Sequence, residues 1–169
     1  MTYHFPTQAV ILIAEHRENK ILMIRKAFRR ALMQSQLEVV RDGAEVLAYL
    51  DGKGKYSNRA DYPLPTLLFL NAKMPGSDAF DVLQSIRNRP PFKKLPVVIM
   101  SSSKTAREVS GARQLGPNSV LVKTRTLEEL IELTGLVNRS WLRHRLAASP
   151  LSEWNGRKQP QPSPLFRRR

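Results

Sequence analysis

The sequence predicts a single α/β domain built on a parallel sheet with helices on both of its faces. Five short apolar runs rich in Val, Ile and Leu alternate with five segments whose apolar residues recur at helical spacing. This alternation is typical of parallel sheets, and continuous apolar runs are typical of strands buried on both faces. At 169 residues, the chain is long enough for one such domain and a short additional segment.

Each strand and helix follows from a local pattern. The first apolar run, AVILIA, is flanked by polar residues, and the helix after it carries Ile21, Ile24 and Phe28 at helical spacing. Asp78 is placed to cap the third helix and Gly116 to end the fourth. The expected strands are Ala9–Ala14, Leu37–Arg41, Thr66–Asn71, Pro96–Ser102 and Ser119–Val122. The expected helices are Glu18–Met33, Ala44–Leu50, Asp78 to about Arg87, Thr105–Gly116, and Leu127 to near Leu146.

Two polar segments stand outside this alternation. Residues Asp51–Pro65 predict an unusually long loop before the third strand. Residues Ser149–Arg169 contain four prolines and little periodicity, which predicts a flexible, basic, proline-rich tail. We therefore divide the chain into a domain at residues 1–148 and a tail at residues 149–169.

The chain is strongly basic, with 28 Lys and Arg against 14 Asp and Glu and a formal net charge of +14. Such a field attracts nucleic acid, anionic membranes or acidic proteins, the alternative being a basic but inert surface. The chain has no cysteine, which excludes disulfides, thiolate metal sites and cysteine nucleophiles. The apolar run near the start is far shorter than a membrane span and lacks the flanks of a signal peptide. We therefore expect a cytoplasmic protein without a membrane partner.

Five short motifs carry a resemblance to a known family. ILIAEH, RDGAEVLAYL, LNAKMPGSDAF, PVVIMSSSK and NSVLVK occur in this order along the chain. From Gln8 to Arg145 the chain resembles the CheY-like receiver domain of two-component response regulators. The resemblance implies a flavodoxin-like, doubly wound sheet of five parallel strands in the order 2-1-3-4-5. The long loop with its PLP motif is also similar to that of small stand-alone regulators that partner bacterial phytochrome kinases.

The resemblance further implies a site at the carboxyl edge of the sheet. Receivers place there an acidic pair, a phosphoryl-accepting Asp, a hydroxyl and a lysine, and the three carboxylates hold Mg²⁺. The chain matches three of these five positions, with Glu15, Ser101 and Lys123, and departs from two, with His16 and Asn71. An imidazole is a poor Mg²⁺ ligand. An amide oxygen has no negative charge and its lone-pair donation is tied up in resonance, so it should not attack a phosphohistidine. We therefore expect a degenerate receiver (a pseudo-receiver) without a Mg²⁺ site, a cofactor or enzymatic activity.

Two interpretations of this pocket stay open. In the first, Lys123 pairs with Glu15 while Asn71 makes hydrogen bonds without phosphate, which locks the site in one state. In the second, these residues are polar remnants that are paired only because they are buried. For His16, the alternatives are a pH sensor, a transition-metal ligand, and a histidine that fills the vacated metal pocket.

Basic residues on two helices indicate candidate partner-binding surfaces. Arg25, Arg29 and Arg30 lie on the first helix, which family members use to dock kinases, and Arg143 and Arg145 lie on the last. These groups suit an acidic partner, and a solvated helix face is the alternative. Family members also self-associate through the fourth helix, fifth strand and fifth helix. We therefore expect a homodimer through that face, with a monomer as the alternative.

These observations predict two-component-type signal transduction by phosphorylation-independent protein–protein interaction. The expected partner is a histidine kinase or another signalling protein. The alternative function is that of a nucleic-acid-binding accessory protein using the basic helix and the tail, where aromatic residues interleave with arginine.

Overall fold

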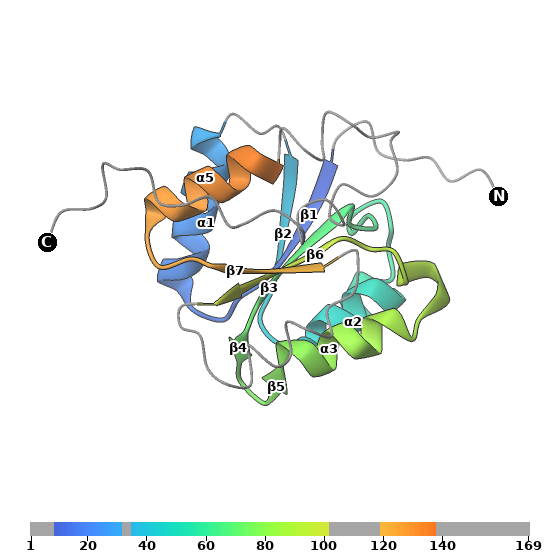
Figure 1. Cartoon of the computed structure of the whole chain (residues 1–169). Helices are drawn as coiled ribbons and strands as arrows, with labels where there is room; N and C mark the ends of the chain where they lie inside the picture. Colours follow the sequence, from blue (N-terminus) through green and yellow to red (C-terminus); the bar gives the residue numbers. More distant parts are fainter. Residues whose placement is uncertain (1–8, 32–34, 102–118, 138–169) are drawn as a thin grey trace, which may run out of the picture.

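The computed structural model describes residues 9–31, 35–101 and 119–137. The strands of its main sheet are β1 (Ala9–Ala14), β2 (Ser35–Val40), β3 (Leu67–Asn71), β6 (Val97–Ser101) and β7 (Ser119–Lys123). The α-helices are α1 (Glu18–Arg30), α2 (Gly43–Asp51), α3 (Ala79–Arg87) and α5 (Leu127–Val137). Figure 1 shows α1 and α5 against one face of the sheet and α2 and α3 against the other.

All neighbouring strands of the main sheet are parallel, and they follow the order β2-β1-β3-β6-β7. In the numbering of the five predicted strands this is 2-1-3-4-5, so the predicted doubly wound fold is confirmed. Strand β2 lies on one side of β1, whereas β3 and the later strands lie on the other side. The order of the strands therefore changes direction between β1 and β3. In open α/β sheets, ligands bind at such a switch point, beyond the carboxyl ends of the strands.

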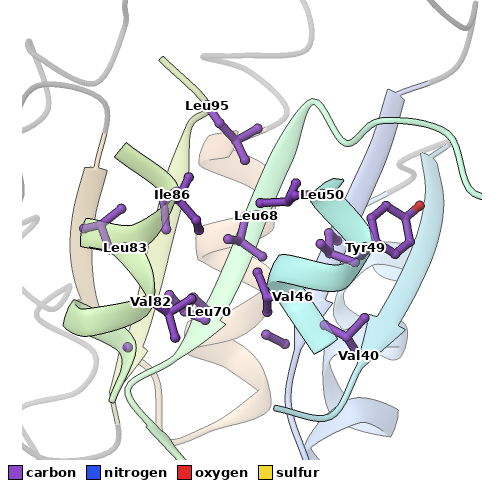
Figure 2. Packing of buried hydrophobic residues seen from close by; sticks show 14 of the residues in the cluster. Val40, Val46, Tyr49, Leu50, Leu68, Leu70, Val82, Leu83, Ile86 and Leu95 are labelled. Carbon is purple, nitrogen blue, oxygen red and sulfur yellow. The ribbon is translucent and has the colours of Figure 1, made fainter. Parts of the chain in front are cut away.

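Alternate residues of the buried strands supply two separate cores. On β3, Leu68 and Leu70 pack toward α2 and α3, whereas Leu67 and Phe69 pack toward α1 and α5. Figure 2 shows the first core, between the sheet and helices α2 and α3; the residues labelled on the helices are Val46, Tyr49, Leu50, Val82, Leu83 and Ile86. This burial on both faces explains why the strands read as continuous apolar runs.

The expected long loop after α2 is well structured. A 3-10 helix, η1 (Gly54–Tyr56), follows Gly52, whose φ of 66° ends α2 in the left-handed region. The guanidinium of Arg59 donates to the carbonyls of Tyr49 and Leu50 at 2.8 Å each. These two carbonyls lie in the last turn of α2. Arg59 adds a donor to the Tyr49 carbonyl, which also accepts from the N–H of Gly52 at 3.2 Å, and donates to the Leu50 carbonyl at the helix end.

Several predicted boundaries shift in the structure. The second strand begins at Ser35 and ends at Val40, because all six of its residues pair with β1 in register. Helix α1 ends at Arg30, short of the predicted Met33. The predicted cap is confirmed, since Oδ1 of Asp78 accepts from the backbone N–H of Phe80 at 2.8 Å.

Other features either were not predicted or lie outside the described part. The sequence reading missed a two-stranded hairpin, β4 (Lys73–Met74) with β5 (Ser77–Asp78), and the 3-10 helix η2 (Pro90–Phe92). The predicted fourth helix, the end of the last helix and the tail fall outside the described residues. The division into a domain and a tail therefore stays a prediction.

Candidate functional site

The carboxyl ends of four parallel strands meet at one edge of the sheet. Asn71 and Ser101 are the last residues of β3 and β6, and Glu15 directly follows β1. In the ladder, Asn71 lies opposite Met100, and Ser101 lies opposite Lys123. The predicted site residues therefore come from neighbouring strand ends, where the topology places a ligand site.

The carboxylate of Glu15 is fully buried and saturated with hydrogen bonds. Its Oε1 accepts from the backbone N–H groups of His16 and Arg17, each at 2.9 Å, and from Arg17 Nε at 3.2 Å. Its Oε2 accepts from Arg17 Nη2 at 3.3 Å and from Asn71 Nδ2 at 2.8 Å. Five donors thus surround two oxygens that offer about four lone-pair directions.

The side-chain amide of Asn71 is also occupied at both ends. While Nδ2 donates to Glu15, Oδ1 accepts from the backbone N–H of Lys73 at 3.3 Å. Only 6% of Asn71 is exposed. A reversed amide would place its oxygen against the Glu15 carboxylate, so the hydrogen bonds fix the orientation.

Arg17 is a site residue that the sequence reading missed. Its guanidinium donates hydrogen bonds to both oxygens of Glu15, and the Arg17 side chain is 45% exposed. Bidentate pairing of arginine with a carboxylate is a strong charge-assisted contact. The available signal was an arginine two residues after the glutamate that directly follows the first strand.

His16 lies beside Glu15 without completing a metal site. Its Nδ1 is 3.4 Å from Oε1 of Glu15, and this buried nitrogen makes no hydrogen bond to the described residues. The histidine side chain is about one-third exposed. His16 therefore lies beside the Glu15 carboxylate and is also in contact with solvent. Its possible roles as a pH sensor, a transition-metal ligand or a space-filling residue all stay open.

A buried lysine joins α1 to the segment after β7. Lys20 Nζ donates to the backbone carbonyl of Thr124 at 2.8 Å, and the N–H of Thr124 donates to the carbonyl of Ser101 at 2.8 Å. Burial, followed by the charge of Arg17, lowers the pKa of Lys20. The backbone of Thr124 is therefore held from two sides. The side chain of Lys123 lies outside the described part, so its pairing with Glu15 stays a prediction.

Mg²⁺ requires hard oxygen ligands in octahedral geometry. At this edge, the described residues place an imidazole and an amide NH₂ group beside the carboxylate of Glu15. Within residues 9–31, 35–101 and 119–137, no three His, Cys, Asp or Glu side chains gather as a metal site. A cation approaching Glu15 would also have to displace hydrogen bonds that are already formed.

The predicted partner-binding residues divide between described and undescribed parts of the chain. Arg25, Arg29 and Arg30 are exposed on α1. Beside them lies Leu22, a large apolar side chain that is 59% exposed. Arg143 and Arg145 fall outside the described residues.

Comparison with known proteins identifies the family. Residues 11–134 match the model of the response regulator receiver domain. The chain belongs to this family of two-component signalling proteins, and the predicted resemblance is confirmed. In the described ranges, no helix is long and apolar enough to cross a membrane.

Two relatives, Rcp1 and RcpA, are similar over most of their length. Response regulator Rcp1 of Synechocystis is 29% identical over 133 residues, which cover 79% of this chain and 88% of the relative. The crystal structure of the phosphorylated cyanobacterial phytochrome response regulator RcpA shares 28% identity, with a TM-score of 0.70, and covers 80% of this chain and 95% of that one. The Mn²⁺-bound form of Rcp1 shares 27% identity, with a TM-score of 0.69, and covers 84% of this chain and 99% of that one.

Proposed function

We propose that the chain is a degenerate response regulator that signals through protein–protein contacts without accepting a phosphoryl group. The observation that carries this proposal is the position of Asn71 at the end of β3, where its amide donates to the buried Glu15 carboxylate. A receiver needs a carboxylate oxygen at this position to attack phosphohistidine. The amide oxygen of Asn71 carries no charge and already accepts from Lys73.

The metal chemistry of the family points the same way. Phosphoryl transfer depends on positioning and on cations that neutralise the transferring group. Among the relatives, RcpA has been crystallised phosphorylated and Rcp1 with Mn²⁺. This chain has an imidazole and an amide at two of the three positions where receivers place metal carboxylates, which supports the loss of both the metal and the phosphate.

The proposed partner is a histidine kinase or another signalling protein with an acidic docking surface. The similarity to phytochrome response regulators favours a kinase of the phytochrome type. On α1, the exposed Leu22 lies among Arg25, Lys26 and Arg29, so the helix offers an apolar contact surrounded by positive charge. Such a surface combines buried apolar area with electrostatic steering toward an acidic partner.

A nucleic-acid-binding function is the second candidate. The net charge of +14 and the row of exposed basic side chains on α1 favour it. Binding of that kind is dominated by phosphate contacts and weakens steeply with salt. The homodimer, the basic tail and the cytoplasmic location remain predictions alongside both functions.

A capture experiment with matched charge variants separates the two functions. The full chain and a chain ending at Ala148 are used as baits in native lysate, with and without nuclease. The double variant Arg25→Glu/Arg29→Glu is compared with Lys93→Glu/Lys94→Glu, which makes the same charge change at exposed positions away from α1.

We expect both chain lengths to retain a histidine kinase after nuclease treatment, and the α1 variant alone to lose it. Purified kinase should then bind the chain without a phosphoryl donor. Capture that disappears with nuclease, or with both charge variants equally, would support the nucleic-acid function instead.

A further inference from the structure

Glu15 already has a cationic partner within its own chain. The guanidinium of Arg17 contacts both oxygens of Glu15 at 3.2 and 3.3 Å, and in receivers the carboxylate at this position holds a divalent cation. We infer that Arg17 is a built-in counter-charge that replaces the metal and competes with any metal for Glu15. The inference rests on the proposed loss of metal-dependent phosphorylation.

The charges explain why a counter-charge is needed. Glu15 is 0% exposed, and a buried carboxylate without a cation or enough hydrogen bonds is costly. His16 contributes a backbone N–H, and Asn71 contributes a neutral amide. Among the side chains that donate to Glu15 in the described part of the chain, Arg17 is the one that is permanently cationic.

The pairing of Arg17 with Glu15 costs little conformational entropy because the two residues are close in sequence. Arg17 is the residue before α1, with extended backbone angles of −88° and 120°, and its own N–H also donates to Oε1 of Glu15. The two residues are two positions apart, so the contact closes a very short loop. The beginning of α1 adds the positive end of a helix dipole near the same carboxylate.

The nearby lysine interacts with Glu15 less directly. Burial lowers the pKa of Lys20 and the charge of Glu15 acts in the opposite direction, but Lys20 directs its Nζ to the carbonyl of Thr124, and no hydrogen bond joins it to Glu15 among the described contacts. A compact ammonium also lacks the planar fork with which Arg17 holds both carboxylate oxygens. Arg17 is therefore the residue whose removal should free Glu15 for a metal.

A metal-binding series tests the inference. The starting variant is His16→Asp/Asn71→Asp, which with Glu15 supplies three carboxylates at the positions that the family uses. To it are added either Arg17→Met or the control Arg25→Met, which removes an exposed arginine of α1 that has no contact with Glu15 in the described structure. Mg²⁺ binding is measured by calorimetry, and folding by circular dichroism with and without Mg²⁺.

We expect the variant with Arg17→Met to bind Mg²⁺ at least tenfold more tightly than the starting variant, and the Arg25→Met control to match the starting variant. Equal affinities with and without Arg17 would overturn the inference while leaving the proposed function intact. Tight Mg²⁺ binding by the natural chain would instead overturn the proposed function.

A double-mutant cycle in the natural background covers the case in which the Arg17→Met metal-binding variant does not fold. Arg17→Met and Glu15→Gln are made singly and together, and the unfolding midpoint in urea is measured. We expect Arg17→Met to lower the midpoint in the natural chain and to have little effect beside Glu15→Gln, and Arg17→Lys to recover part of the loss. An equal loss in both backgrounds would overturn the inference.

Discussion

Nδ2 of Asn71 donates a hydrogen bond to Oε2 of Glu15 over 2.8 Å, and both side chains are buried. In a phosphate-accepting receiver, the residue at the end of this strand presents a carboxylate to a metal. Here it presents an N–H donor to its neighbour. The two residues satisfy each other without phosphate, as the proposed phosphorylation-independent signalling requires.

Asn71→Asp should therefore weaken the fold without restoring function. The change replaces a donor with a second carboxylate beside Glu15, in a buried position where like charges repel. We expect the free energy of unfolding to fall by about 1–3 kcal/mol at neutral pH, as for a lost buried hydrogen bond with an unpaired charge. Urea denaturation measures the loss.

Asn71→Ala serves as the control, because it removes the donor without adding a charge. Asp should be at least as destabilising as Ala at low ionic strength. Robust Mg²⁺-dependent phosphorylation of Asn71→Asp would contradict this description of the pocket, since His16 remains in place of the second carboxylate.

Glu45 should make the stability of the domain sensitive to acid. Burial alone would raise the pKa of Glu45, but hydrogen bonds from Lys55, Tyr56 and the N–H of Arg41 outweigh it and hold the pKa below the usual 4.5. Because the folded pKa is the lower one, the carboxylate stabilises the fold above about pH 4.5 and loses this effect as the pH falls through the folded value.

The measurement is urea denaturation of Glu45→Gln across this pH range. The variant should be less stable than the natural chain at pH 7, and the difference should shrink in acid. Glu132→Gln, at an exposed position of α5, is the control. A difference that does not change between pH 7 and pH 3 would argue against this assignment.

Gly43 should not tolerate a side chain. A Cβ at this position would lie 2.5 Å from Val82 Cγ2 and 2.7 Å from Ser77 Oγ, because α2 approaches α3 and β5 closely. We expect Gly43→Ala to cost about 1–3 kcal/mol, as for overpacking of a core. Thermal unfolding measures the loss. The control Ala44→Ser, at the exposed next position, should change stability little. Equal losses for the two variants would contradict close packing at Gly43.

Arg59 should stabilise the end of α2 and the loop after it. Arg59→Leu leaves the carbonyls of Tyr49 and Leu50 without their guanidinium donor. We expect a loss of about 1–3 kcal/mol, with faster amide exchange around Gly52. Lys53→Leu is the matched control, because the exposed side chain of Lys53 pairs with Asp51 in the described structure and contacts no carbonyl of α2 there. Unchanged amide exchange in Arg59→Leu would show that the loop is stable without the guanidinium of Arg59.

The strands were predictable because they depend on local patterns: AVILIA indicated a strand buried on both faces. The resemblance to receivers supplied the site residues Glu15, Asn71 and Ser101, and parallel strand order is consistent with their lying at one edge. Arg17 and Lys20 could not be assigned in this way. Their roles depend on where long side chains turn, toward Glu15 and Thr124, and neither spacing nor composition encodes that direction.

Intact-mass analysis after incubation with acetyl phosphate and Mg²⁺ tests the central claim most directly. A phosphorylation-competent receiver treated in parallel shows that the reagent is active. The natural chain should keep its mass, because Asn71 has an uncharged amide whose two ends already make hydrogen bonds, and because Glu15 is paired with Arg17. A Mg²⁺-dependent gain of one phosphoryl group by the natural chain would contradict the claim that its site works without phosphate.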